Sequence, residues 1–214
     1  MKLTVFGATG GTGTCLTAQA LAAGHSVTAV VRDPARLAVP AHPRLDVVTA
    51  DVLDPASITP AVDGADAVLT AVAPPGTGPS TLRQDSTRSI IEAMQKTGVR
   101  RLLAVSGSIV ADQGESPYLR YLLKPLVRRT FLRHVCADFR GAEDEIHASD
   151  LDWTIFRPPS LTGKPARGSY RTATDRSLPH CFSISRADLA ACMLTLLDDP
   201  AVVRRRVGRV LPAV

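Results

Sequence analysis

Three glycines stand three residues apart near the start of the chain, after an apolar run at residues 2–6 and before a helical pattern at residues 12–23. A phosphate approaches the backbone closely only where side chains are absent, and the N–H groups at a helix N-terminus then point at it. Gly7 would permit the tight turn, Gly10 the close approach and Gly13 the packing of helix on strand. The pattern predicts a dinucleotide-binding turn, a G-x-x-G-x-x-G variant of the known fingerprint.

The position after the second apolar run, residues 26–31, distinguishes the two nicotinamide dinucleotides. A carboxylate there suits the ribose hydroxyls of NAD, whereas an arginine can bind the 2′-phosphate of NADP through two hydrogen bonds. This chain has Arg32, and Arg36 follows about one helical turn later. Asp33 leaves the alternative open, because a carboxylate one residue late could still bind ribose. The two arginines favour NADP(H).

Further candidate residues stand where the later predicted strands end. Asp51 and Val52 could hold the adenine, although Asp51 could instead simply begin a turn. Small residues such as Ala73 suit a nucleotide that lies across the fourth strand, and a hydroxyl after the fifth would face the nicotinamide. These candidates are Asp51, Val52, Val72, Ala73, Ser106, Ser108, Pro158, Pro159 and Ser160.

The chain lacks the tyrosine and lysine four residues apart that many dehydrogenases use. Residues four apart share one helix face, so that the ammonium group can lower the pKa of the phenol. Lys124 stands three residues after Tyr121, and Ser108 precedes Tyr121 by thirteen residues. Pro125 disturbs the helix that this group would need. Ser108 and Tyr121 are candidate catalytic residues, with ordinary loop residues as the alternative.

Composition favours a single soluble α/β domain. The chain has 214 residues, of which 45% are hydrophobic, and no apolar stretch approaches the ~20 residues of a membrane helix. Because the N-terminus reads as a strand rather than a targeting segment, we expect a cytoplasmic protein. Aromatic residues make up 4% of the chain, which argues against base stacking on nucleic acid. Four cysteines without a C-x-x-C pair predict buried thiols and no metal site.

The elements that must position these residues alternate along the chain. Strands are predicted near residues 2–6, 26–31, 45–49, 67–72, 101–106 and 153–157, and helices near 12–23, 82–97, 140–149 and 186–197. This order predicts a Rossmann-type doubly wound parallel sheet with helices on both faces, in a single domain over residues 1–214. Two stretches escape the alternation, near residues 107–139 and 158–184, and could wall the ligand crevice. Residues 185–188 predict a helix N-cap without chemistry.

Several stretches resemble the atypical short-chain dehydrogenase/reductases, above all the NAD(P)H-binding group that includes biliverdin reductase B (a flavin reductase) and the NmrA-like proteins. The resemblance runs from end to end of the chain. It is carried by residues 5–13, 30–37, 50–54, 151–158 and 185–190.

The resemblance implies a site residue by residue. The pyrophosphate would lie against Gly7, Thr9, Gly10, Gly11, Thr12 and Gly13, the 2′-phosphate against Arg32 and Arg36, and the adenine against Asp51 and Val52. The nicotinamide half would lie beside Val72, Ala73, Pro158, Pro159, Ser160 and Leu161. Two positions depart from the biliverdin reductase B pattern, because Gly107 stands in place of a serine and Ser160 in place of a histidine.

The resemblance is specific for the fold and the cofactor but says little about the substrate. We expect an NADPH-dependent oxidoreductase that transfers hydride to a small conjugated acceptor such as a flavin, a quinone or a polyketide-like enone or ketone. One alternative is an NmrA-like redox sensor that binds NADP(H) without turnover, and another is a non-redox isomerase, epimerase or dehydratase. The expected partner is a small-molecule substrate, with no nucleic acid or membrane, and the oligomeric state stays open.

Overall fold

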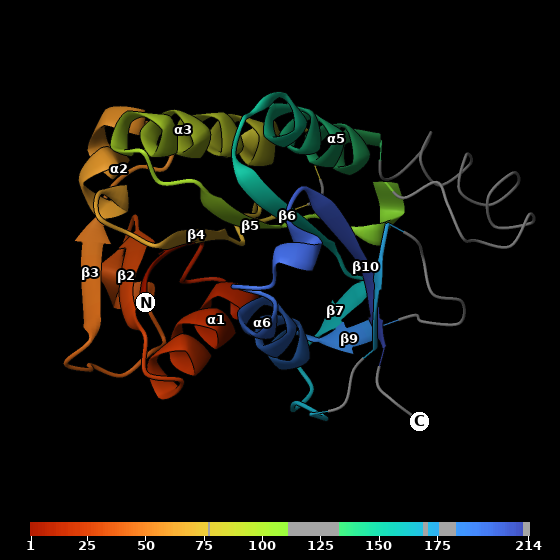
Figure 1. The fold of residues 1–214 in the computed structure, drawn as a ribbon, viewed down its shortest axis with the longest axis horizontal. Helices are drawn as coiled ribbons and strands as arrows, with labels where there is room; N and C mark the ends of the chain where they lie inside the picture. The colour runs from red at the N-terminus through yellow and green to blue at the C-terminus, as the bar shows by residue number, and fades with distance from the viewer. Residues whose placement is uncertain (77, 111–132, 169–170, 176–182, 212–214) are drawn as a thin grey trace, which may run out of the picture.

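The fold is built on one large central sheet. The computed structural model describes residues 1–76, 78–110, 133–168, 171–175 and 183–211 (Figure 1). The sheet contains eight strands in the order β3-β2-β1-β4-β5-β6-β10-β8, and all neighbours pair in parallel except β8 with β10. Its strands are β1 (Lys2–Phe6), β2 (Ser26–Val31), β3 (Leu45–Thr49), β4 (Ala67–Thr70), β5 (Arg101–Val105), β6 (Asp152–Arg157), β8 (Arg171–Thr174) and β10 (Arg205–Leu211). The first six strands have the doubly wound order, so the predicted Rossmann-type sheet is confirmed.

Helices cover both faces of this sheet (Figure 1). On one face α1 packs against α6, and on the other α3 packs between α2 and α5. Strand β4 is buried along its whole length, because both faces of a parallel sheet are covered. No helix within the described ranges is long and apolar enough to span a membrane. The helices are α1 (Gly11–Ala22), α2 (Pro55–Val62), α3 (Leu82–Thr97), α5 (Arg133–Ala148) and α6 (Arg186–Thr195).

The six strands predicted from the sequence are all present, but one helix boundary was wrong. Helix α5 begins at Arg133 rather than near residue 140, so part of the stretch 107–139 is helical. Its early turns bury Asp138, which pairs with Arg83 on α3 at 3.1 Å. A carboxylate on the buried face hides the apolar periodicity by which a helix is recognised.

Helix α2 and strand β10 were not predicted from the sequence, because the residues of each resemble another kind of structure. Helix α2 begins with Pro55 after the N-cap Asp54, whose carboxylate accepts the N–H of Ala56 at 3.0 Å, and this short sequence reads as a turn. Strand β10 begins with two arginines and is therefore too polar to be recognised as a strand.

A small second sheet lies beside α6. It pairs β7 (Ser160–Thr162) with β9 (Ser183–Ser185) in parallel. Ser185 ends β9 and caps α6, since its hydroxyl accepts the N–H of Asp188 at 2.9 Å. The predicted N-cap is confirmed.

Candidate functional site

Two of the three glycines in the loop after β1 are required by the protein itself. Gly7 has a φ of +77°, and a Cβ added there would lie 2.7 Å from the carbonyl carbon of Ala71. A Cβ added at Gly13 would lie 2.1 Å from the carbonyl oxygen of Gly7. The tight turn and the close packing of α1 on the loop therefore both depend on glycine.

Gly10 is different, because little in the protein demands a glycine there. It is exposed, its φ is −83°, and an added Cβ would meet only the carbonyl oxygen of Gly7, at 3.3 Å. Gly10 is also the N-cap of α1 and offers no side chain to the N–H groups of the first turn. A helix start with uncapped N–H groups and open space in front of it fits an anion. The first turn holds Gly11, Thr12 and Gly13.

A groove of about 370 Å³ opens in front of this loop, along the carboxyl ends of β1, β2, β3 and β4. This volume lies within the usual range for a small-molecule site. The groove brings together most of the residues predicted to bind the nucleotide. Those that line it are Gly7, Thr9, Gly10, Arg32, Arg36, Asp51, Val52, Val72 and Ala73.

Two exposed arginines stand at the β2 end of the groove. The side chains of Arg32 and Arg36 have no hydrogen bond or ion pair with any residue in the described part of the chain. The nearby carboxylate of Asp33 is engaged instead in capping a short 3-10 helix (Pro34–Arg36), where it accepts the N–H of Ala35 at 3.0 Å. Both guanidinium groups therefore keep their donors for a ligand.

Asp51 forms the turn that is one of its two expected roles, and it also stands where the other role, adenine binding, would place it. Its carboxylate accepts the N–H of Leu53 at 3.1 Å and so forms a turn. The residue is also exposed on the wall of the groove, next to Val52. A carboxylate oxygen accepts more than one hydrogen bond, so this turn leaves acceptor capacity for an adenine amino group.

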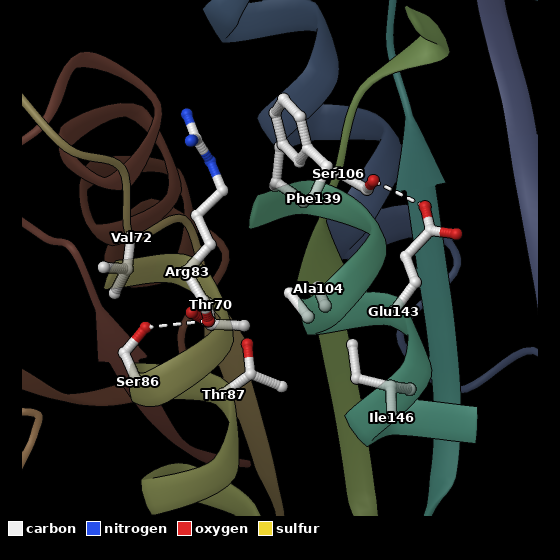
Figure 2. A pocket seen from close by; sticks show the side chains of 12 residues that line it. Thr70, Val72, Arg83, Ser86, Thr87, Ala104, Ser106, Phe139, Glu143 and Ile146 are labelled. Carbon is white, nitrogen blue, oxygen red and sulfur yellow. Dashed lines mark hydrogen bonds between the residues drawn. The ribbon is translucent and has the colours of Figure 1, made fainter. Parts of the chain in front are cut away.

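A second, smaller cavity of about 20 Å³ lies where β5 ends, between α3 and α5, and shares Val72 with the groove (Figure 2). Ser106, which is 7% exposed, donates its hydroxyl hydrogen to Glu143 Oε1 at 2.5 Å. Arg157 pairs with the same carboxylate, with Nε 2.9 Å from Oε1. Because Ser106 donates its only hydrogen to this ion pair, its oxygen faces a ligand as an acceptor rather than as an acid.

The same corner leaves little room for a side chain at Gly107, where the biliverdin reductase B pattern has a serine. A Cβ at Gly107 would lie 3.2 Å from the ring of Phe139 on α5. The guanidinium of Arg83 lies over this ring, 4.1 Å from its centroid, and also pairs with Asp138. Burial lowers the pKa of Arg83 below its ordinary value, and the bond to Asp138 opposes that effect. Phe139 therefore occupies the space that a serine side chain would crowd.

The predicted residues after β6 are not brought to the groove. Pro158 and Pro159 are buried, Ser160 and Leu161 belong to β7, and none of the four lines it. Pro158 accepts the N–H of Ser108 at 2.9 Å, which ties the end of β6 to the end of β5.

Of the candidate catalytic residues, the structure describes Ser108 but not Tyr121. Ser108 begins a short 3-10 helix (Ser108–Val110) and is half-buried. Tyr121 and Lys124 lie outside the described residues. Sequence reasoning missed Glu143 and Arg157 altogether, since no local pattern links a helix residue with a strand residue fourteen positions later.

Comparison with known proteins identifies the family of this chain. A model of an NAD(P)H-binding family matches residues 7–200. An uncharacterised chloroplast protein of Arabidopsis thaliana is 32% identical over 200 residues, which cover 89% of this chain and 69% of that protein. A 3-diazoavenalumate denitrifying reductase from a Streptomyces species is 37% identical over 132 residues, 56% of this chain and 42% of the reductase. A provisionally named epimerase from Bacteroides thetaiotaomicron has a crystal structure that matches with a TM-score of 0.83 and 28% identity, over 100% of this chain and 97% of that one.

Proposed function

The chain belongs to the NAD(P)H-binding family, as a protein of the atypical short-chain dehydrogenase/reductase type, and we propose that it is an NADPH-dependent reductase of a small conjugated acceptor. The observation that carries the proposal is the pair of exposed arginines, Arg32 and Arg36, beside a groove that ends at an uncapped helix. Their guanidinium groups, which have no partner among the described residues, suit a 2′-phosphate.

The residues of the groove fit the cofactor along its length. The first-turn N–H groups of α1 would bind the pyrophosphate, Asp51 and Val52 the adenine, and Val72 and Ala73 would lie beside the nicotinamide. When bound, the reduced nicotinamide supplies a hydride. Ser106 offers an acceptor to a carboxamide or a substrate hydroxyl, so the proton for the product comes from water or from a rim hydroxyl such as Ser108.

The acceptor class rests on the family and on the shape of the site. Small residues at the nicotinamide end leave room for a compact, flat molecule, for which we propose a flavin, a quinone or a polyketide-like enone or ketone. The Streptomyces relative is a reductase, which supports redox turnover. The Bacteroides relative favours a second candidate, an epimerase or isomerase on the same fold. A sensor that binds NADP(H) without turnover is the third.

The cofactor preference is tested by titrating NADPH and NADH into the protein and following fluorescence. We expect NADPH to bind at least about tenfold more tightly, because charge-assisted bonds to the 2′-phosphate contribute roughly 1.5–3 kcal/mol. Arg32→Ala should remove most of this preference, whereas Lys96→Ala, an exposed cation on α3 paired with Glu92, should retain it. Equal affinities in the unmutated protein would refute the choice of NADPH.

Turnover is tested by following NADPH oxidation with a panel of flavins, quinones and enones. A rate that rises with acceptor concentration and saturates supports the reductase. Tight binding without turnover would favour the sensor, and rearrangement of a substrate without net NADPH consumption would favour the isomerase. We expect Ser108→Ala to change the rate little, against the ~10²-fold loss that a proton relay through this hydroxyl would cause.

A further inference from the structure

Helix α6 begins with an arginine that lies directly on the glycine loop. A Cβ added at Gly11, the first residue of α1, would lie 2.7 Å from Cδ and 3.0 Å from Nε of Arg186. A Cβ added at Gly163 would lie 4.0 Å from Nη1 of the same side chain. The side chain of Arg186 therefore occupies the space above Gly11, and a Cβ at this position would displace it.

The guanidinium of Arg186 has no partner within the described part of the chain. The side chain is half-buried, yet no hydrogen bond or ion pair to a described residue satisfies its donors. Burial raises the pKa of Cys15 in α1, and the charge of Arg186 partly opposes this increase, so the charge reaches the first turns of that helix. A partly buried cation with no counterion among the described residues, next to the positive end of a helix, favours an anion that compensates both charges.

The backbone around Arg186 is held firmly. Ser185 caps α6, and the carboxylate of Asp188 accepts the N–H groups of Arg167 at 2.9 Å and of Gly168 at 3.1 Å. On the α1 side, Gln19 Nε2 donates to the carbonyl oxygen of Ala187 at 3.0 Å. Arg186 is therefore carried by a helix start that is tied both to α1 and to a loop.

We infer that Arg186 binds the pyrophosphate of the dinucleotide, opposite the first-turn N–H groups of α1. The inference rests on the proposed cofactor function and adds to it a second cationic contact, supplied from the far end of the chain. Arg32 and Arg36 line the β2 end of the groove and suit the 2′-phosphate. Arg186 lies at Gly11 instead, where a dinucleotide places its pyrophosphate.

Binding of two different nucleotides distinguishes a contact of Arg186 with the pyrophosphate from a contact of Arg32 with the 2′-phosphate. NADPH carries both a pyrophosphate and a 2′-phosphate, whereas adenosine 2′-monophosphate carries only the latter. We expect Arg186→Ala to weaken NADPH binding about tenfold to a hundredfold and to leave the affinity for adenosine 2′-monophosphate unchanged. Arg32→Ala should weaken both. Arg167→Ala removes an exposed cation whose backbone lies beside the same helix start, and it should change neither affinity.

A double-mutant cycle with Gly11 tests the contact itself. Gly11→Ala should weaken NADPH binding by displacing the side chain of Arg186, without a change in secondary structure measured by circular dichroism. In the Arg186→Ala background the same substitution should cost little, because the side chain that it displaces is gone. Equal losses from Gly11→Ala in both backgrounds would contradict a shared mechanism.

Failure of the inference can be distinguished from failure of the proposed function. If Arg186→Ala binds NADPH as tightly as the unmutated protein, the inference is overturned while the cofactor assignment stands. If only the KM for an acceptor rises, Arg186 binds the substrate and the inference is also wrong. If the unmutated protein binds neither nucleotide, the proposed function and the inference both fail.

Discussion

The two ends of the site use arginine in opposite ways. At the end formed by the groove, which joins the glycine loop to β2, Arg32 and Arg36 are exposed and have no carboxylate partner in the described part of the chain. At the β5 corner, Arg83 and Arg157 are mostly covered and each is paired, with Asp138 and Glu143 respectively. Unpaired exposed cations contribute little to folding but stay available to an anion, whereas the partners in a buried pair compensate each other and leave no charge free.

This difference separates binding from stability. The loop end can change its residues with modest effects on the fold, provided that the turn keeps Gly7 and Gly13. The β5 corner cannot, because loss of one partner would leave an uncompensated charge among mostly buried residues. Substitutions at the loop end should therefore change the affinity for the nucleotide, whereas substitutions at the β5 corner should change the free energy of unfolding.

The largest expected effect is that of Glu143→Ala on stability. This side chain is 4% exposed and holds both Arg157 and Ser106. Its loss should lower the free energy of unfolding by about 3–5 kcal/mol, because Arg157 stays buried without its partner. Urea denaturation measures the change, with Glu92→Ala in the exposed pair with Lys96 as the control, for which we expect less than about 1 kcal/mol. Similar losses from both variants would remove the distinction between the two ends.

The next effect is that of Gly10→Val on affinity. A branched side chain should occupy the space in front of α1 and weaken NADPH binding at least about a hundredfold, roughly 2.7 kcal/mol. Stability should change by less than about 1 kcal/mol, because Gly10 is exposed and has an ordinary φ. Gly13→Val is the contrasting variant, since its Cβ would overlap the carbonyl oxygen of Gly7 and must disturb the fold. A folded Gly10→Val protein with full affinity would disprove the placement of the phosphates.

The smallest effect concerns pH near the end of α5, one helical turn after Glu143. Burial, and then the charge of Arg206, lower the pKa of His147 in the folded protein, whereas Glu143 and Asp144 oppose this shift. The unfolded chain, with a histidine pKa of about 6.5, therefore binds a proton first, and stability should fall as the pH decreases through this value. In the fold His147 Nε2 lies 2.9 Å from Arg206 Nη2, a contact that suits a neutral ring.

The pH effect is measured by urea denaturation between pH 7.5 and about pH 5.5. His147→Gln should flatten this dependence, because the variant has no group that titrates in the range. Parallel curves for the variant and the unmutated protein would assign the loss of stability to other groups.

The glycine loop, the six strands and Arg32 were accessible from the sequence because each depends on neighbours along the chain. A turn at Gly7, an N-cap at Ser185 and an apolar strand are recognised within a few residues. The groove follows from the same information, since the carboxyl ends of parallel strands meet at one edge of the sheet. For the same reason Asp51 and Val52, distant from the loop in sequence, could be assigned to its wall.

Only the tertiary structure determined which charges are free. Arg83, Arg157 and Arg186 are alike as letters in the sequence, but the first two meet carboxylates on α5 and the third meets Gly11 on α1. These partners come from distant parts of the chain, and one sequence carries no local signal for them. A carboxylate within 4 Å decides whether a guanidinium stabilises the fold or stays available to a ligand, because electrostatic interactions between charges depend on distance and burial.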